Sequence, residues 1–258
     1  MLQVMRCLHA SLLAALSFSL TSPATALTVM LTPDDYDGLY SYATASLGTQ
    51  RTDVFPVAVP FSQTVVQVGW QATITSTYEF SNSGFLISAD AVRGSGRHAG
   101  AWSTGQISFT LDEPALYTAS GLFSALNEVD GGSVELWAGL WDMTPDTGRY
   151  VFWDRHISRE TRNETLSLGG EDGDRDGFSR GSLMGILLPN VEYRFLYRMK
   201  LFVNGAPTGS YRPGPTGHGF VSLDLSPIPE PGTGLLLGIG LVGMAGLRST
   251  GPRSRRTS

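Results

Sequence analysis

Cysteine is almost missing from this chain. The single cysteine, Cys7, lies within the first 26 residues and precedes the apolar run 8–20, whereas a lipid-accepting cysteine should follow that run. The chain beyond residue 26 contains none, which excludes a disulfide framework there. That part of the molecule must be stabilised by its core, with or without a bound ion.

Positive charge is also scarce, and Lys200 is the only lysine. Of the 18 basic residues, Arg6 and four C-terminal arginines belong to the ends of the chain, which leaves 13 basic residues against 23 acidic ones. Because Glu230 also lies in the C-terminal tail, the central part of the chain carries a net charge of 13 − 22 = −9. Nucleic acids and anionic lipids select clusters of Lys and Arg. We expect no nucleic-acid partner.

Several catalytic signatures are missing. There is no H-E-x-x-H motif, no glycine-rich phosphate loop ahead of a helix, and no E-x-D-x-x-E or E-x-D-x-E pattern as in jelly-roll glucanases. Glycoside hydrolysis needs two carboxylates about 5 to 10 Å apart. Scattered carboxylates offer such pairs in any chain, here Glu135, Asp142, Asp154 and Glu160. We predict no catalytic residues and no enzyme, with a carbohydrate-active enzyme that uses Glu135 and a partner as the alternative.

Metal-ligand candidates are few. Asp172, Asp174 and Asp176 alternate ahead of Gly177, as in the first half of a calcium loop. The twelfth position is Leu183, where a bidentate glutamate is expected, so half of the ligand set is missing. Ca²⁺ is the one cofactor that the sequence suggests, and a solvated acidic turn is the alternative. We expect surface positions, rather than a metal triad, for three histidines: His98, His156 and His218.

The N-terminus has the features of an export signal. Arg6 precedes the apolar run 8–20, and Ala24-Thr25-Ala26 forms an A-x-A cleavage site. We predict a helical signal peptide over residues 1–26, with Leu27 as the first mature residue. The alternative is a buried N-terminal helix.

The last thirty residues form a tripartite tail over residues 227–258. Pro229-Glu230-Pro231 is followed by the apolar run 235–247, only 13 residues long. A helix that spans a bilayer comfortably needs about 20 residues, so we predict a short transmembrane helix. Basic residues after such a helix favour the cytoplasm, and here they are Arg248, Arg253, Arg255 and Arg256.

This tail resembles the PEP-CTERM sorting signal in its Pro-Glu-Pro motif, apolar run and arginines. The resemblance covers about the last thirty residues. It implies recognition by an exosortase, a membrane-embedded cysteine transpeptidase, and removal of the tail near the motif. It also implies a Gram-negative bacterium that makes extracellular polysaccharide. One departure is that residues 249–252 separate Arg248 from the other three arginines.

Residues 27–226 read as one all-β domain. Apolar residues alternate with polar ones, and Gly, Pro, Asn and Asp separate the segments, as in antiparallel strands with one buried face. The clearest stretches are 64–80, 106–111, 117–126, 133–142 and 191–204, and 219–225 is the closing strand. We predict nine to eleven strands in an antiparallel β-sandwich of jelly-roll type. Residues 28–52 are polar and irregular, and we expect a lead-in strand or an ordered arm.

Tryptophans are concentrated in the middle of the domain. In residues 133–142, Trp137 and Trp141 alternate with aliphatic residues, and Trp153 follows nearby. If the aliphatic residues form the core, these tryptophans face outward with Glu135, as in modules that stack on sugar rings. The alternative is a central strand buried on both faces.

Together these features predict an exported, non-enzymatic protein. It would be anchored transiently in the inner membrane and then reach the cell surface or extracellular matrix. Its role would be structural or adhesive within the exopolysaccharide layer. The main alternative is a carbohydrate-binding module that uses Trp137, Trp141 and Trp153 and has extracellular polysaccharide as its partner.

Overall fold

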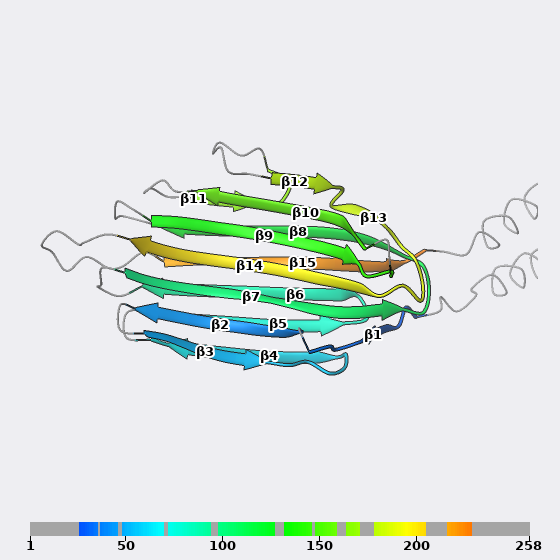
Figure 1. Cartoon of the computed structure of the whole chain (residues 1–258), viewed down its shortest axis with the longest axis horizontal. Coiled ribbons are helices and arrows are strands. Elements are labelled where there is room, and N and C mark those ends of the chain that lie inside the picture. The colour runs from blue at the N-terminus through cyan, green and yellow to red at the C-terminus, as the bar shows by residue number, and fades with distance from the viewer. Residues whose placement is uncertain are drawn as a thin grey trace, which may run out of the picture. The chain divides into compact units, whose positions relative to one another are not determined.

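The computed structural model describes residues 26–35, 37–45, 48–69, 72–93, 98–126, 132–145, 148–158, 164–170, 178–204 and 216–228. Residues Leu27–Pro227 form one compact unit. Its described residues make fifteen strands, and the pairings between them are antiparallel (Figure 1). The prediction of an all-β, antiparallel fold is therefore confirmed, while the jelly-roll connectivity stays a prediction.

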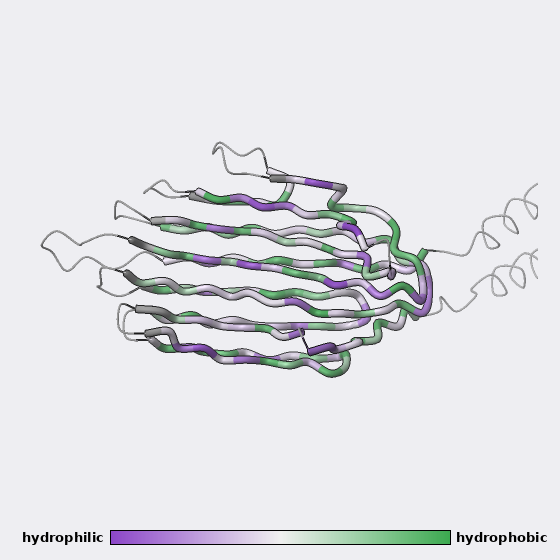
Figure 2. Tube along the Cα trace, in the orientation of Figure 1, coloured by the Kyte–Doolittle hydropathy of each residue, from purple (hydrophilic) through white to green (hydrophobic). Residues whose placement is uncertain are grey.

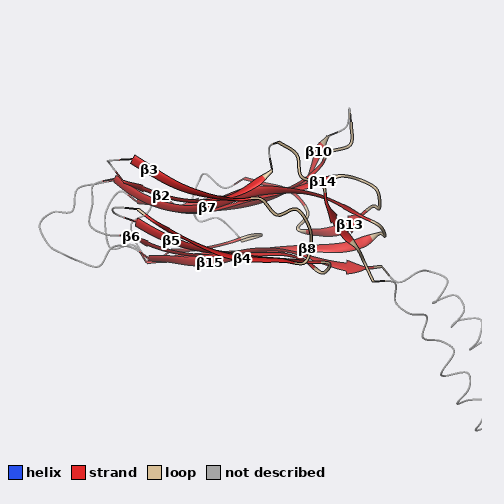
Figure 3. Cartoon of the chain, turned by 90° about the horizontal axis from the view of Figure 1, so that it is seen from below, coloured by secondary structure: helices blue, strands red, loops and turns tan. Residues whose placement is uncertain are grey.

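Two sheets face each other (Figure 3). Sheet A contains, in spatial order, β12 (Phe178–Gly181), β10 (Arg149–Ser158), β9 (Gly132–Asp142), β14 (Tyr193–Asn204), β7 (His98–Leu111), β2 (Gly38–Ala45) and β3 (Gly48–Val54), with β1 (Val29–Leu31) beside the end of β7. Sheet B contains β11 (Glu164–Ser167), β8 (Ala115–Leu126), β15 (Thr216–Pro227), β6 (Gly84–Arg93), β5 (Ala72–Ser81) and β4 (Phe61–Val68), with β13 (Met184–Leu187) beside β8. The chain crosses between the sheets from β7 to β8 and from β14 to β15.

Alternation along the central strands builds the core, and hydrophobic positions recur along both layers (Figure 2). Every second residue of β14 from Tyr193 to Leu201 is buried, as are Val134, Leu136, Ala138 and Leu140 of β9. Aromatic rings join the sheets, since the Phe85 ring of β6 lies 5.0 Å from that of Phe109 and 6.2 Å from that of Phe195.

A buried group of hydroxyls also links the two sheets. The Ser41 hydroxyl of β2 donates to Ser76 of β5 at 2.8 Å and lies 3.0 Å from the Tyr78 hydroxyl. Tyr197 of β14 bonds to Ser103 of β7 at 3.2 Å and to Tyr78. Burial raises the pKa of the Tyr197 phenol well above its usual value, so the group stays neutral. Such satisfied polar groups fix how the two sheets align.

One expectation from the sequence is wrong. The single strand expected over 64–80 is a hairpin of β4 and β5, in which Val66 and Val68 face solvent and Val65 and Gln67 are buried. Of the two alternatives for residues 28–52, the strand is confirmed and the arm is not, because these residues supply β1, β2 and most of β3 in sheet A.

The signal helix predicted over 1–26 and the transmembrane helix predicted over 235–247 both lie outside the described residues. Within the described ranges, no helix is long and apolar enough to cross a membrane.

Candidate functional site

The structure places the three tryptophans together on the outer face of sheet A. The Trp137 and Trp153 rings stack with centroids 4.7 Å apart. Tyr150, which the sequence did not single out, joins them to the third indole, with centroids 4.7 Å from Trp141 and 5.2 Å from Trp153. All four side chains are half-buried. We call these four residues the tryptophan cluster.

Strand register explains why this cluster is continuous. Tyr150 pairs with Trp141 and Phe152 pairs with Leu140, so the register shifts around Val151. A β-bulge of this kind changes which face the following residues occupy. Phe152 therefore points into the core while both Tyr150 and Trp153 face outward.

Gly139 lets the Trp153 indole lie close to the sheet. It pairs with Trp153 on β10, and a Cβ at position 139 would lie 2.5 Å from a carbon of the indole. Any larger residue there has to displace the ring.

Glu135 lies beside the cluster and is held by two guanidiniums. Its carboxylate is 6% exposed, and it lies 2.9 Å from Arg155 Nη2 and 3.9 Å from Arg198 Nη1. Arg198 also lies over the Trp137 ring, with its Cζ atom 5.3 Å from the centroid. Both oxygens of Glu135 thus face cations, and the carboxylate fixes arginines next to the indoles.

A second aromatic group, which the sequence analysis missed, lies further along the same face. The Tyr42 ring of β2 stacks on Trp102 of β7 with centroids 5.0 Å apart. Arg51 of β3 lies over Tyr40 and Tyr42, at 4.1 Å and 5.6 Å from the ring centroids. We call Tyr40, Tyr42 and Trp102 the tyrosine group. The alternation of Tyr40 and Tyr42 with Leu39, Ser41 and Ala43 is the signal that could have found it.

A buried ion pair lies inside the sandwich on β10. His156 Nε2 is 2.9 Å from Asp154 Oδ2, and the side chains are only 4% and 1% exposed. The surface position expected for His156 is therefore wrong. Despite the cost of burial, hydrogen bonds from His156, the Gly169 N–H (2.6 Å) and Ser179 leave the pKa of Asp154 below its usual value. Asp154 Oδ1 is buried without a hydrogen-bond partner.

Residues 177–181 read Gly-Phe-Ser-Arg-Gly, which matches the G-x-S-x-G pattern of a nucleophile elbow. That elbow needs a sharp turn from a strand into a helix, whereas Ser179 lies within strand β12. Ser179 bonds to Asp154 rather than presenting its hydroxyl to His156. The pattern therefore lacks the arrangement of a catalytic triad.

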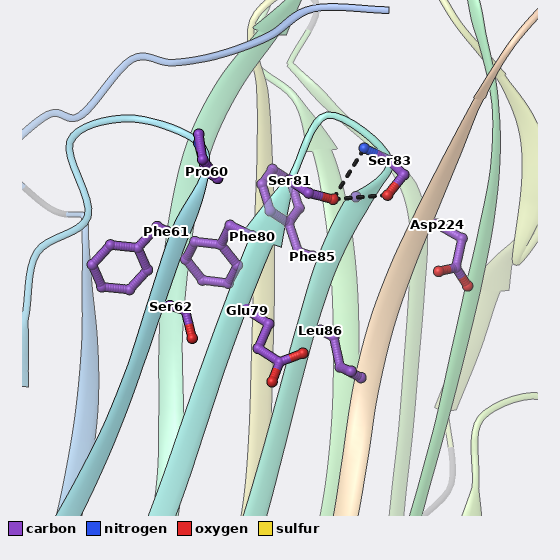
Figure 4. A pocket seen from close by; sticks show the side chains of 11 residues that line it. Pro60, Phe61, Ser62, Glu79, Phe80, Ser81, Ser83, Phe85, Leu86 and Asp224 are labelled. Carbon is purple, nitrogen blue, oxygen red and sulfur yellow. Dashed lines mark hydrogen bonds between the residues drawn. The ribbon is translucent and has the colours of Figure 1, made fainter.

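Sheet B carries an open hollow of about 650 Å³ at the β5–β6 hairpin (Figure 4). Figure 4 shows Glu79 and Asp224 on its walls, with the Phe61 and Phe80 rings to one side. The two rings stack with centroids 5.5 Å apart. The described residues that line the hollow include carboxylates and no cation, so its charge is opposite in sign to that of the cations on the outer face of sheet A.

The other residues singled out from sequence lie outside the described ranges. They are the acidic residues Asp172, Asp174 and Asp176, the motif Pro229-Glu230-Pro231, and the arginines Arg248, Arg253, Arg255 and Arg256. Among the residues that the structure does describe, no three His, Cys, Asp or Glu side chains gather as metal ligands would.

Comparison with known proteins identifies one feature. The PEP-CTERM protein-sorting motif matches residues 227–249, starting at the last residue of β15. No curated protein matches the chain. A solved structure, that of the infectious bursal disease virus Gt strain, is 13% identical over 86% of this chain and 71% of the other, with a TM-score of 0.13. So low a structural similarity carries no argument about this fold.

Proposed function

We propose, from the premise that this chain is a PEP-CTERM protein, that it is a non-enzymatic surface or matrix protein whose sheet A binds extracellular polysaccharide. The sorting motif at residues 227–249 implies export and processing by an exosortase-type system. The inner membrane would hold the chain only until its tail is removed. The body would then act as an adhesive element in the exopolysaccharide layer.

The observation that carries this proposal is the outer aromatic face of sheet A. Seven aromatic rings from four strands lie on it: Tyr40, Tyr42, Trp102, Trp137, Trp141, Tyr150 and Trp153. Aromatic side chains bury apolar area at little entropic cost and leave polar atoms free for hydrogen bonds. A flat sheet that displays several rings suits the extended, weakly apolar faces of a sugar polymer.

Glu135 supports the non-enzymatic part of the proposal. Its two oxygens face Arg155 and Arg198, whereas a hydrolytic pair needs a second carboxylate across the substrate. We expect the purified protein to release no reducing ends from a broad panel of glycans. Release that Glu135→Gln abolishes would overturn this part.

Polysaccharide binding can be tested with a double variant, Trp137→Ala/Trp153→Ala. Two lost stacking surfaces should weaken retention in affinity electrophoresis on gels that contain extracellular polysaccharide from the producing bacterium by about tenfold or more. Phe220→Ala is the control, because Phe220 is 37% exposed on the outer face of sheet B. Equal retention of all three proteins would contradict the proposal.

Sorting is tested separately in the producing cells. Changing Pro229, Glu230 and Pro231 to alanine should keep the chain at full length in the membrane fraction, whereas the native chain is shortened and released. An Arg253→Ala/Arg255→Ala variant tests whether the spread basic cluster is also needed. Normal shortening of the alanine variant of the motif would show that processing does not use it.

A further inference from the structure

Most basic residues of the described strands belong to one sheet. Seven of them lie in strands of sheet A, and one, Arg93, ends β6 of sheet B; the seven are Arg51, Arg149, Arg155, Arg180, Arg194, Arg198 and Lys200. The outer face of sheet B instead displays hydroxyl and aliphatic side chains with Glu79, Asp90 and Asp224. For a chain whose central part is strongly acidic, this is a marked polarity between the two faces.

These cations flank aromatic rings in register across sheet A. Arg51 pairs with Tyr42, Tyr42 with Trp102, and Trp102 with Lys200, on four neighbouring strands. A second row runs from Arg198 through Trp137 to Arg155. Neighbouring strands lie about 4.8 Å apart, so the first row extends about 14 Å across the sheet.

Lys200 is a cation on this face that is held by aromatic rings. Its Nζ atom lies 5.3 Å from the Phe202 ring centroid and 5.9 Å from that of Trp102. Among the described residues, no carboxylate lies within ion-pair distance of it, because Glu135, its neighbour on β9, faces Arg155 and Arg198. An ammonium group held by rings and half-buried can accept a carboxylate from a ligand.

Other cations on this face are already paired with acidic residues of the protein, which limits the density of negative charge that a ligand can carry. Arg51 pairs with Asp53, and Arg194 with Asp34, so these cations are already partly compensated. A polyphosphate needs many uncompensated Lys and Arg side chains. A polymer of sugar rings that bear occasional carboxylates matches rings and cations in alternation.

We infer that the outer face of sheet A selects acidic polysaccharides, namely those built with uronic acids. The sugar rings contact the accessible parts of Trp102, Tyr42 and the tryptophan cluster, and their carboxylates pair with Lys200. This inference rests on the proposed polysaccharide binding and adds the class of polymer.

The test compares acidic polymers with neutral ones of the same linkage. The full chain in detergent is titrated with polygalacturonate, alginate and hyaluronan, and with the carboxyl-reduced form of each. We expect at least one acidic polymer to bind about tenfold more tightly than its reduced form at 50 mM NaCl. The ratio should fall at 300 mM NaCl, since salt screens ion pairs.

Variants distinguish the ion pairs from the aromatic contacts. Lys200→Gln should lower affinity for the acidic polymer by about threefold or more and leave the reduced polymer unaffected, while Lys200→Arg restores binding. Trp102→Ala should weaken both, and Phe220→Ala neither. Circular dichroism checks that each variant is folded.

Each outcome decides something. Equal affinity for acidic and reduced polymers overturns the inference and leaves the proposed function intact. If the protein binds no polysaccharide, including the native exopolysaccharide, both the inference and the proposed function are contradicted. Tighter binding of single-stranded DNA, with displacement of the acidic polymer, would assign the face to nucleic acid and also overturn the inference.

Discussion

Asp154 and His156 show how a single buried pair can carry a large share of local stability. They bring together β10, β12 and the turn at Gly169, since Asp154 accepts bonds from His156, Gly169 and Ser179. Removing the imidazole leaves the buried Asp154 carboxylate without one of its hydrogen-bond partners, which costs about 3 kcal/mol for a charged group. We expect His156→Gln to lower the free energy of unfolding by about 3 kcal/mol in urea denaturation at pH 7.

The same pair gives a pH dependence of known sign. The pKa of Asp154 is lower in the folded protein than its usual 3.8. Its contribution is therefore fully present above pH 3.8 and is lost as the pH falls below that value through the folded pKa. The stability advantage of the native chain over Asp154→Asn should hold down to about pH 4 and shrink as the pH falls from about 4 to about 2. An advantage that stays constant over this range would contradict this account.

Gly139 gives a second prediction at this scale. A methyl group at this position would overlap the Trp153 ring, so Gly139→Ala should tilt the indole away from Trp137 and cost about 1–3 kcal/mol. Near-UV circular dichroism should lose the signal of the stacked indoles, and polysaccharide binding should weaken. Leu196→Ala, which changes the neighbour of Gly139 on β14, should preserve that signal. An unchanged signal in Gly139→Ala would mean that the ring does not lie over this residue.

Among the strands, β14 shows best how elements are held together. Its inward residues are large and apolar except for the hydroxyls of Tyr193 and Tyr197, and the Tyr197 hydroxyl bonds across to β7 and β5. Tyr197→Phe leaves Ser103 and Tyr78 short of a partner. It should lower the free energy of unfolding by about 1–2 kcal/mol.

Tyr193→Phe is the matched control, because its hydroxyl accepts a hydrogen bond from the Leu188 N–H in the short connection between β13 and β14. Urea denaturation of both variants measures the difference. A Tyr197→Phe protein as stable as the native chain would show that the hydroxyl group does not help to align the sheets.

The strands that could be predicted from sequence are those whose inward positions are all apolar. In β9 and in β14 up to Leu201, period-2 alternation revealed both the strand and its buried face. In β2 the inward-facing Ser41 is one of the buried hydroxyl residues, so the strand lacks a clear alternation of apolar and polar residues. The hairpin of β4 and β5 was missed because apolar residues continue across the turn although the buried positions change phase.

The candidate site follows the same logic. Trp137 and Trp141 share a face because they are four residues apart within one strand. Trp153 stacks on Trp137 because β9 pairs with β10 and because of the bulge near Val151. The rows of cations and rings depend on pairings between strands far apart in sequence, such as β7 with β14. Register between distant strands leaves no local signal.

For the whole molecule, the predicted calcium loop remains to be tested. A ligand that binds only the folded state stabilises it by about 2.7 kcal/mol at one hundred times its dissociation constant. We expect the melting temperature to rise by several degrees from EDTA to millimolar Ca²⁺, and Asp174→Ala and Asp176→Ala to abolish the rise. Glu79→Ala, on the outer face of sheet B, is the control. No shift would make residues 172–176 a solvated turn.

The position of β15 has a mechanical consequence. β15 pairs with β8 on one side over twelve residues and with β6 on the other over nine, and it ends at Pro227, where the sorting motif begins. Hydrogen bonds between antiparallel strands run perpendicular to the strands, so a pull along β15 loads both ladders in shear and at the same time. β1, by contrast, has three residues paired on one side. Tension applied at the C-terminal end therefore meets a long strand that is paired on both sides, whereas tension at the N-terminal end meets a three-residue strand that is paired on one side.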